Sequence, residues 1–162
     1  MRRLLALLPL SLFAGACGNA YIQSPIYDEE LRVRRTADAE AITTLMEEYA
    51  RAVDALDVDA VRALVSESYY ENAGTTDTTR DDYGVEGLAA MFETLRGHVE
   101  TMDVAINVRE IRVAGDAADV LFEYAYRVRY SVAEQSHWAT ERDVNRFQLQ
   151  RERGEWLIVG GL

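Results

Sequence analysis

One segment near the C-terminal end of the chain carries side chains suited to acid–base chemistry. Residues 138–150 alternate as a strand would, which places Asp143 and Asn145 on the same side as the apolar Phe147. A carboxyl group buried beside tyrosines has a raised pKa and can give or take a proton. An exposed Asp143 would instead form a surface ion pair with a neighbouring arginine. The sequence leaves both interpretations open.

Aromatic and imidazole groups offer further chemistry. Tyr124, Tyr126 and Tyr130 share one side of an expected strand, where they could line a ligand pocket, fill the core or form a contact between two sheets of a dimer. The two histidines, His98 and His137, lie in unrelated contexts. We expect His98 near the C-terminal end of a helix, where a cation is favourable.

Other kinds of site have no pattern in this sequence. It has no clustered metal ligands, no phosphate-binding glycine loop and no nucleophile elbow. Asp77, Asp81 and Asp82 lack the glycine and the terminal glutamate of a calcium loop. We therefore expect neither a metal ion nor a cofactor.

Composition narrows the class of partner. The 162 residues include 17 basic side chains, all arginine, against 28 acidic ones, for a formal net charge of −11. A free nucleic-acid-binding protein needs a surplus of positive charge on at least one face, so nucleic acid is not an expected partner. The length and the 49% hydrophobic content allow one ordinary globular core.

The N-terminal residues are typical of an export signal. Two arginines precede an apolar run over residues 4–13, which is too short to span a bilayer as a helix. Residues 14–17, Ala-Gly-Ala-Cys, resemble the lipobox of bacterial lipoproteins, in which the cysteine is lipidated and becomes the new N-terminus. The resemblance implies a signal peptide over residues 1–16 and, over residues 17–38, a lipidated Cys17 and a tether. The alternative is a plain signal peptide with a stray cysteine.

Lipidation would also fix the location of the protein. An acidic chain is repelled by anionic headgroups, so attachment would come from the acyl chains on Cys17 and not from a basic patch. Gly18 stands where an aspartate often retains such lipoproteins at the inner membrane. We therefore expect a protein anchored in the outer membrane and facing the periplasm.

Helical periodicity marks the first half of the remaining chain. Residues 39–56 carry one apolar stripe, for which Asp38 is a plausible N-cap, and Asp57 opens a second, shorter helix. Residues 66–82 are polar and turn-rich around Asn72. A third stripe over residues 88–99 follows Gly84 and Gly87 and predicts a third helix.

Two-residue alternation marks the second half. Strands are expected over residues 104–113, 120–130, 138–150 and 156–159, joined by turns at Gly115 and Gly154. The apolar parity changes near Arg109 and Glu110, which predicts a β-bulge there. We therefore expect residues 39–162 to form one α+β domain, in which three N-terminal helices pack on a curved antiparallel sheet.

This order of elements resembles the SnoaL-like branch of the nuclear transport factor 2-like superfamily. The resemblance rests on short strings at residues 49–52, 56–57, 84–88, 113–118 and 153–158. It implies a cone-shaped half barrel that encloses an apolar pocket. The superfamily includes isomerases, dehydratases, cyclases and epoxide hydrolases as well as domains without activity, so the fold alone does not decide the function.

Comparison with the steroid isomerases of this superfamily suggests roles for single residues. Tyr49 is similar in position to their oxyanion donor, although a core aromatic on a helical stripe is the favoured interpretation. Glu71 precedes Asn72, where the isomerases commonly have an aspartate as base, and an amide cannot abstract a proton. Asp143 lies on the strand that is similar to the one from which the isomerases supply a protonated carboxylic acid. The candidate pocket residues are thus Tyr49, Asn72, Phe92, Tyr124, Tyr126, Asp143 and Asn145.

Two functions remain open at this point. The missing base favours a lipid-anchored, non-catalytic domain that binds a small, partly apolar ligand or an envelope partner. The alternative is an isomerase or dehydratase for a hydrophobic small molecule, with Asp143 or Glu71 as acid or base and Tyr49 as the polarising donor. A homodimer formed through the sheet face is compatible with either.

The lipid anchor can be tested directly. Replacement of Cys17 by Ser removes the only thiol, so we expect the protein to leave the membrane fraction for the soluble one. Fractionation of cells followed by immunoblotting measures the distribution. A variant that stayed with the membranes would contradict the anchor.

Overall fold

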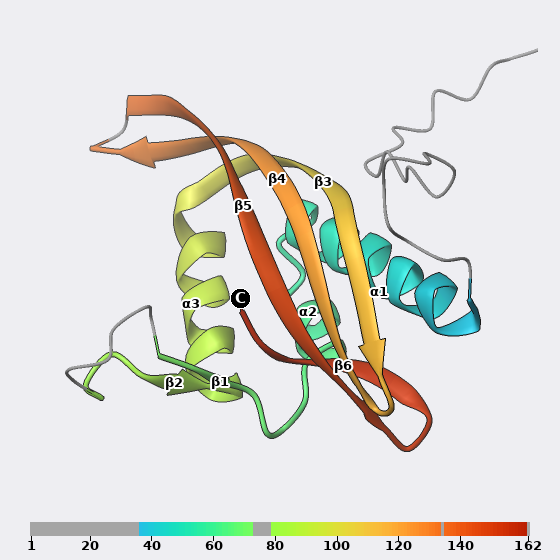
Figure 1. Cartoon of the computed structure of the whole chain (residues 1–162). Helices are drawn as coiled ribbons and strands as arrows, with labels where there is room; N and C mark the ends of the chain where they lie inside the picture. The colour runs from blue at the N-terminus through green and yellow to red at the C-terminus, as the bar shows by residue number, and fades with distance from the viewer. Residues whose placement is uncertain (1–35, 73–78, 134, 162) are drawn as a thin grey trace, which may run out of the picture.

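The fold is a curved antiparallel sheet with three helices on its concave side, as Figure 1 shows for the computed structural model. The structure describes residues 36–72, 79–133 and 135–161; residues 1–16, Cys17 and nearly all of the expected tether lie outside these ranges. The elements in chain order are α1 (Ala37–Asp54), α2 (Val58–Ala63), β1 (Tyr70–Glu71), β2 (Tyr83–Gly84), α3 (Val85–His98), β3 (Val99–Ala114), β4 (Ala117–Val132), β5 (Gln135–Glu152) and β6 (Glu155–Gly160). The predicted α+β class and cone shape are confirmed.

Two helix starts differ from the sequence prediction. The third helix begins at Val85 and not at residue 88, so that Gly87 lies inside it. Thr36, and not Asp38, caps α1, and its hydroxyl accepts a hydrogen bond from the Ala39 amide at 3.1 Å. The last two residues assigned to the tether therefore belong to the helix. Asp38 instead forms an ion pair with Arg151, 2.5 Å away on β5. The predicted Asp57 cap of α2 is confirmed, since its carboxylate accepts from the Ala60 amide at 3.0 Å.

The main sheet follows the expected meander. Strands β3, β4, β5 and β6 pair in chain order, each antiparallel to the next. The register shifts between Val108 and Glu110, which confirms the predicted bulge. Gly115 and Gly154 have φ of 63° and 95° in the two tight turns, where a left-handed backbone favours glycine.

The described part of the chain also holds a small sheet that the sequence did not predict. Strands β1 and β2 pair within the segment expected to be only polar and turn-rich. Gly87 packs against this sheet, because a Cβ there would lie 2.6 Å from the Tyr83 Cβ. Each strand has two residues, too few for alternation to be visible in sequence.

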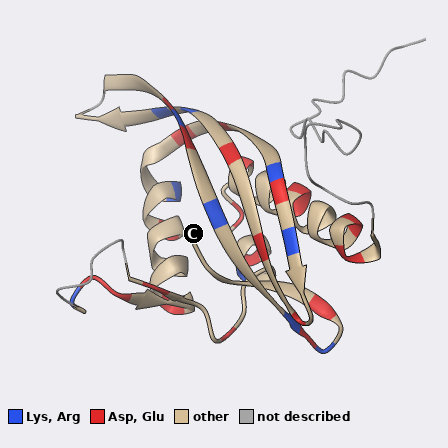
Figure 2. Cartoon of the chain, viewed as in Figure 1, with Lys and Arg blue, Asp and Glu red and all other residues tan. Residues whose placement is uncertain are grey.

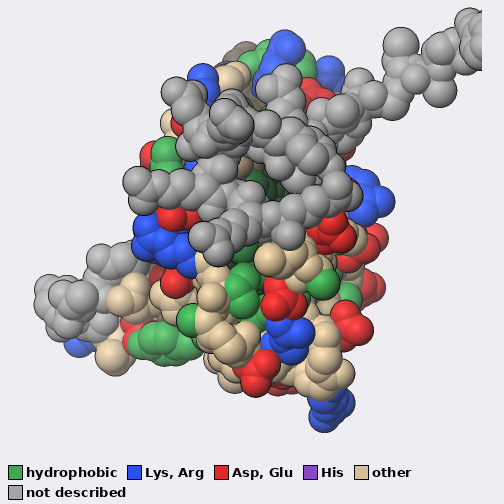
Figure 3. Space-filling view, turned by 45° about the vertical axis from the view of Figure 1, so that its right-hand side comes forward, with side chains coloured by type: hydrophobic (Ala, Val, Ile, Leu, Met, Phe, Trp, Pro, Cys, Tyr) green, Lys and Arg blue, Asp and Glu red, His purple; other side chains and the backbone are tan. Residues whose placement is uncertain are grey.

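The core lies between the helices and the concave face of the sheet. Ile42 and Met46 of the α1 stripe are fully buried, as are Phe147 and Ile158 from the sheet. The outer face carries charges instead, and Figure 2 shows arginines and acidic residues interleaved along β3, β4 and β5. Acidic and basic side chains are also mixed over the described part of the face in Figure 3. No basic stripe is therefore seen on these surfaces.

Two methionines provide a matched test of this core. Met46 is 0% exposed, whereas Met91 on α3 is 41% exposed. We expect Met46→Ala to lower the free energy of unfolding by about 2–5 kcal/mol through lost burial and a residual cavity. Met91→Ala should change it by no more than about 0.5 kcal/mol. Urea unfolding of both variants measures the difference, and equal effects would contradict the packing described.

Candidate functional site

A cavity of about 190 Å³ lies between α1, α3 and the concave face of the sheet. Its walls are almost entirely apolar, with tyrosine hydroxyl groups and one side-chain amide as the polar groups. It is lined by Tyr49, Val53, Phe92, Leu95, Met102, Val104, Ile106, Phe122, Tyr124, Tyr126, Asn145 and Phe147. A concave, mainly apolar cavity with a few polar groups is the usual form of a small-molecule site.

Tyr49 supplies the deepest polar group. Its ring packs edge-on against Phe147, with centroids 5.0 Å apart. Burial, and then the nearby hydroxyls of Tyr124 and Tyr83, raise the pKa of Tyr49 well above its usual range. The phenol is therefore neutral at physiological pH and can donate a hydrogen bond. It has no hydrogen-bond partner among the described residues, so this donor is available to a ligand.

Two further phenols, those of Tyr124 and Tyr126, lie where the cavity lining meets the surface. The rings of Tyr124 and Tyr126 are parallel within 3°, with centroids 6.2 Å apart. The Tyr126 hydroxyl donates to the Glu141 carboxylate, and this hydrogen bond is the main cause that raises the pKa of Tyr126 to about 12. Burial raises the pKa of Tyr124, and the charges of Glu141 and Asp143 add to it. Glu141 and Asp143 are exposed and lie directly across the sheet from Tyr126 and Tyr124, so both carboxylates border the exposed edge of the cavity lining.

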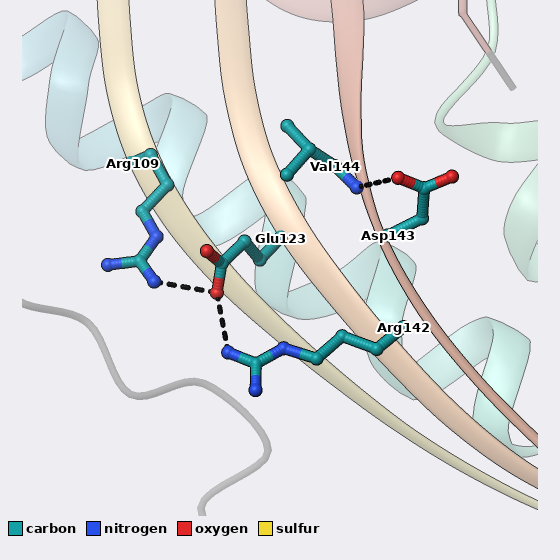
Figure 4. A network of polar contacts seen from close by, with 5 residues as sticks. All are labelled: Arg109, Glu123, Arg142, Asp143 and Val144. Carbon is teal, nitrogen blue, oxygen red and sulfur yellow. Dashed lines mark hydrogen bonds and ion pairs between the residues drawn. The ribbon is translucent and has the colours of Figure 1, made fainter.

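Asp143 is exposed and is not part of the cavity lining. Its carboxylate accepts a hydrogen bond from the Val144 amide at 2.7 Å. The surface ion pair considered for Asp143 does not form with Arg142, which projects to the opposite side of β5 and contacts Glu123 at 2.9 Å (Figure 4). Arg109 contacts the same Glu123 oxygen at 2.6 Å, and the hydrogen bonds from Arg109 and Arg142 lower the pKa of Glu123.

Glu71 also lies outside the cavity lining, together with Asn72. One Glu71 oxygen accepts from the Asn72 amide at 3.0 Å and the other from the Gly161 amide at 2.9 Å. The Gly161 carbonyl in turn accepts from the Asn145 side-chain amide at 2.9 Å. Glu71 therefore holds the backbone at Gly161, and it is not placed to act on a molecule inside the cavity.

The structure thus brings together five of the seven residues expected to form a pocket: Tyr49, Phe92, Tyr124, Tyr126 and Asn145. Asp143 lies at the opening, and Glu71 and Asn72 lie elsewhere. Glu141 is a site residue that sequence reasoning missed. It precedes Asp143 by two positions, so the same alternation that singled out Asp143 could have found it.

The two histidines lie outside the cavity lining and contact other parts of the fold. His98 ends α3, and its ring contacts the Thr94 carbonyl at 2.8 Å, while His137 packs near the Tyr130 ring at 5.7 Å. Over residues 36–72, 79–133 and 135–161, no group of three or more His, Cys, Asp or Glu side chains could hold a metal ion. In the same ranges no helix is both long and apolar enough to cross a membrane.

Comparisons with known proteins identify similar domains. A family model described as a SnoaL-like domain matches residues 34–160. A conserved protein from Planctomyces limnophilus is 19% identical with a TM-score of 0.63, over 78% of this chain and 94% of that one. A ketosteroid isomerase-like protein from Erwinia carotovora is 18% identical with a TM-score of 0.62, over 78% and 95%.

A hexachlorocyclohexane dehydrochlorinase of type 2 is 17% identical with a TM-score of 0.61, over 77% of this chain and 82% of that one. At these identities the likeness shows a shared fold and does not transfer an activity. A search of curated proteins found no match to the sequence.

The contact between Tyr126 and Glu141 can be measured by titration. The Glu141 carboxylate favours the neutral phenol, because ionised Tyr126 would lose its hydrogen bond and lie beside a like charge. Glu141→Gln keeps an acceptor but removes the charge, so Tyr126 should ionise at lower pH, with its pKa moving from about 12 towards the ordinary 10.0.

Ring resonances of labelled tyrosine report the ionisation, and Tyr126→Phe assigns the signal. Glu67→Gln removes an equal charge from another exposed position and should leave the Tyr126 titration unchanged. A Tyr126 signal that titrated identically in the Glu141→Gln variant would show that the contact is absent in solution.

Proposed function

The chain belongs to the family of SnoaL-like domains, and from that premise we propose that it binds a small, partly apolar molecule in the cavity beside Tyr49 without catalysing its conversion. The fold is shared with catalytic and non-catalytic proteins, so the proposal depends on the site and not on the family.

One observation carries the proposal: the cavity contains a hydrogen-bond donor but no carboxylate among its lining residues. A general base must lie within about 2.6–3.2 Å of the proton that it abstracts, or one water away. Glu71 is bound to two backbone amides, and Asp143 is exposed beyond the opening. Tyr49 can therefore orient a ligand oxygen, while no described group inside the cavity is placed to remove a proton.

Size limits the ligand. Drug-sized molecules occupy pockets of about 300–1,000 Å³, whereas an engineered dry cavity of about 150 Å³ binds benzene in another protein. The cavity here measures about 190 Å³ and is lined by six aromatic rings. A ligand whose buried part is a single ring, with one oxygen or other acceptor near Tyr49, matches both the volume and the donor.

We further propose that this domain acts outside the cytoplasm, held by lipid on Cys17 in the outer membrane. The support is the signal-like leader, the lipobox-like residues 14–17 and Gly18 after the cysteine. The acidic composition fits a domain that makes no contact with anionic lipid except through its acyl chains.

An isomerase or dehydratase is the second candidate function. The observation that favours it is Glu141, whose carboxylate is bonded to Tyr126 at the opening of the cavity. A ligand that extended from Tyr49 to this opening would have a polarising phenol at one end and a carboxylate at the other. In that case Glu141, and not Glu71, would be the base.

The role of Tyr49 can be tested with two matched probes. Cyclohexanone offers a carbonyl oxygen to the phenol, and methylenecyclohexane has the same shape without the oxygen. Tyr49→Phe should weaken cyclohexanone binding about threefold to tenfold, the worth of one hydrogen bond, and leave methylenecyclohexane binding unchanged. Titrations followed by amide chemical shifts measure both affinities. If cyclohexanone bound equally well to the wild-type chain and to Tyr49→Phe, a ligand held by Tyr49 would be contradicted.

The same ketone distinguishes binding from catalysis. An enzyme that abstracts a proton beside a carbonyl would exchange the α-hydrogens of cyclohexanone in deuterated water. We expect exchange no faster than in buffer, with the wild-type chain and with Glu141→Gln and Asp143→Asn. Exchange that required Glu141 or Asp143 would overturn the non-catalytic proposal in favour of the second candidate.

A further inference from the structure

We propose that the ligand of this cavity is an organic cation, with its apolar ring inside the cavity and its ammonium group at the opening, between the phenols of Tyr124 and Tyr126 and the carboxylates of Glu141 and Asp143. This inference rests on the proposed function and specifies its ligand class.

The register of the sheet places the two carboxylates beside the two phenols. Tyr124 is the direct partner of Asp143 across β4 and β5, and Tyr126 is the partner of Glu141. Directly opposed residues of an antiparallel pair project to the same face, here the concave face that carries the cavity. The four side chains therefore form one polar rim, and Asn145, next along β5 on that face, continues into the cavity lining.

The electrostatic potential at this rim is negative. Both carboxylates raise the pKa of Tyr124, and Glu141 also raises that of Tyr126, because a second negative charge is unfavourable there. The same potential that disfavours a phenolate attracts a cation. The same potential would repel the charged group of an anionic ligand.

No arginine of the described chain neutralises these carboxylates. Arg127 and Arg142 occupy the alternate positions of β4 and β5 and project from the outer face, where Arg142 contacts Glu123 and Arg127 lies over the Trp138 ring. The contacts of Glu141 and Asp143 are instead a phenol hydroxyl and a backbone amide. The acidic pair therefore lies beside an apolar cavity with no cation paired to it in residues 36–72, 79–133 and 135–161.

The lining itself suits a cation that carries apolar groups. Six aromatic side chains surround the cavity: Tyr49, Phe92, Phe122, Tyr124, Tyr126 and Phe147. An ammonium group within about 6 Å of an aromatic ring centroid is attracted by the ring face, and aromatic enclosures are a common means of binding quaternary ammonium ions. Aromatic walls with an acidic opening thus match a hydrophobic amine or quaternary ammonium compound better than a neutral or acidic one.

Three probes of similar size test the inference on the folded full-length mature chain. Benzyltrimethylammonium carries a permanent positive charge, neopentylbenzene is its uncharged carbon isostere, and phenylacetate carries a negative charge. Affinities are measured by amide chemical shifts, at low and at physiological salt. We expect benzyltrimethylammonium to bind far more tightly than phenylacetate, and we expect its affinity to fall as salt is added.

The decisive variant is the double substitution Glu141→Gln and Asp143→Asn, which removes both charges at exposed positions while it keeps similar shapes. It should lower the affinity for benzyltrimethylammonium about tenfold and change the affinity for neopentylbenzene by less than about twofold. The control is Glu47→Gln with Asp59→Asn, which removes equal charge from exposed positions of α1 and α2. This control should leave the affinity for the cation within about twofold, because screening at physiological salt limits the effect of distant charges.

Each outcome separates the two proposals. If neopentylbenzene binds and the affinity for benzyltrimethylammonium does not depend on Glu141 and Asp143, the inference of a cationic ligand is wrong, while the proposed binding function stands. Tighter binding of phenylacetate than of the cation would also overturn the inference. If none of the three probes binds to the wild-type chain, the proposed function fails together with this inference.

Discussion

The alternation of side chains across three long paired strands is the constraint on which the rest of the structure depends. Because β3, β4 and β5 stay in register apart from two shifts in β3, between Val99 and Thr101 and between Val108 and Glu110, the residues between these shifts are assigned to one of two faces. One face carries the core, the cavity and the polar rim. The other carries the ion pairs that join Glu123 to arginines on both neighbouring strands. A slip of one residue on β5 would exchange Asp143 with Arg142 and abolish the site.

Much of the fold was predictable because its signals are local. The apolar stripe of α1, the Asp57 cap and the bulge depend on residues close together in sequence, and the resemblance to SnoaL-like domains was confirmed by the matching family model. The error at Asp38 has a distant cause. Its carboxylate is engaged by Arg151, 113 positions away, which leaves Thr36 to cap the helix. Local pattern cannot reveal such a partner.

The candidate site was predictable in part for the same reason. Alternation placed Tyr124 and Tyr126 on one side of one strand and Asn145 beside Phe147 on another, and the resemblance pointed to Tyr49. Neither could show that Glu71 holds the Gly161 backbone, because that contact joins segments 90 positions apart. Glu141 was overlooked because the sequence analysis followed the strand from Asp143 towards Asn145 and Phe147 and did not consider the position two residues before Asp143. The pairing of β4 with β5 adds what alternation cannot show, namely that Glu141 lies directly across from Tyr126.

The ion pair between Asp38 and Arg151 also has a mechanical consequence. It joins the first turn of α1 to the β5 strand at the point where the chain enters the domain. Tension applied through the preceding residues would load this contact and the Thr36 cap first. Tyr49 lies 11 positions further along the helix, or about 16 Å at 1.5 Å per residue. A domain pulled by its N-terminal end would therefore bear the force in the α1 to β5 junction, while the cavity kept its shape.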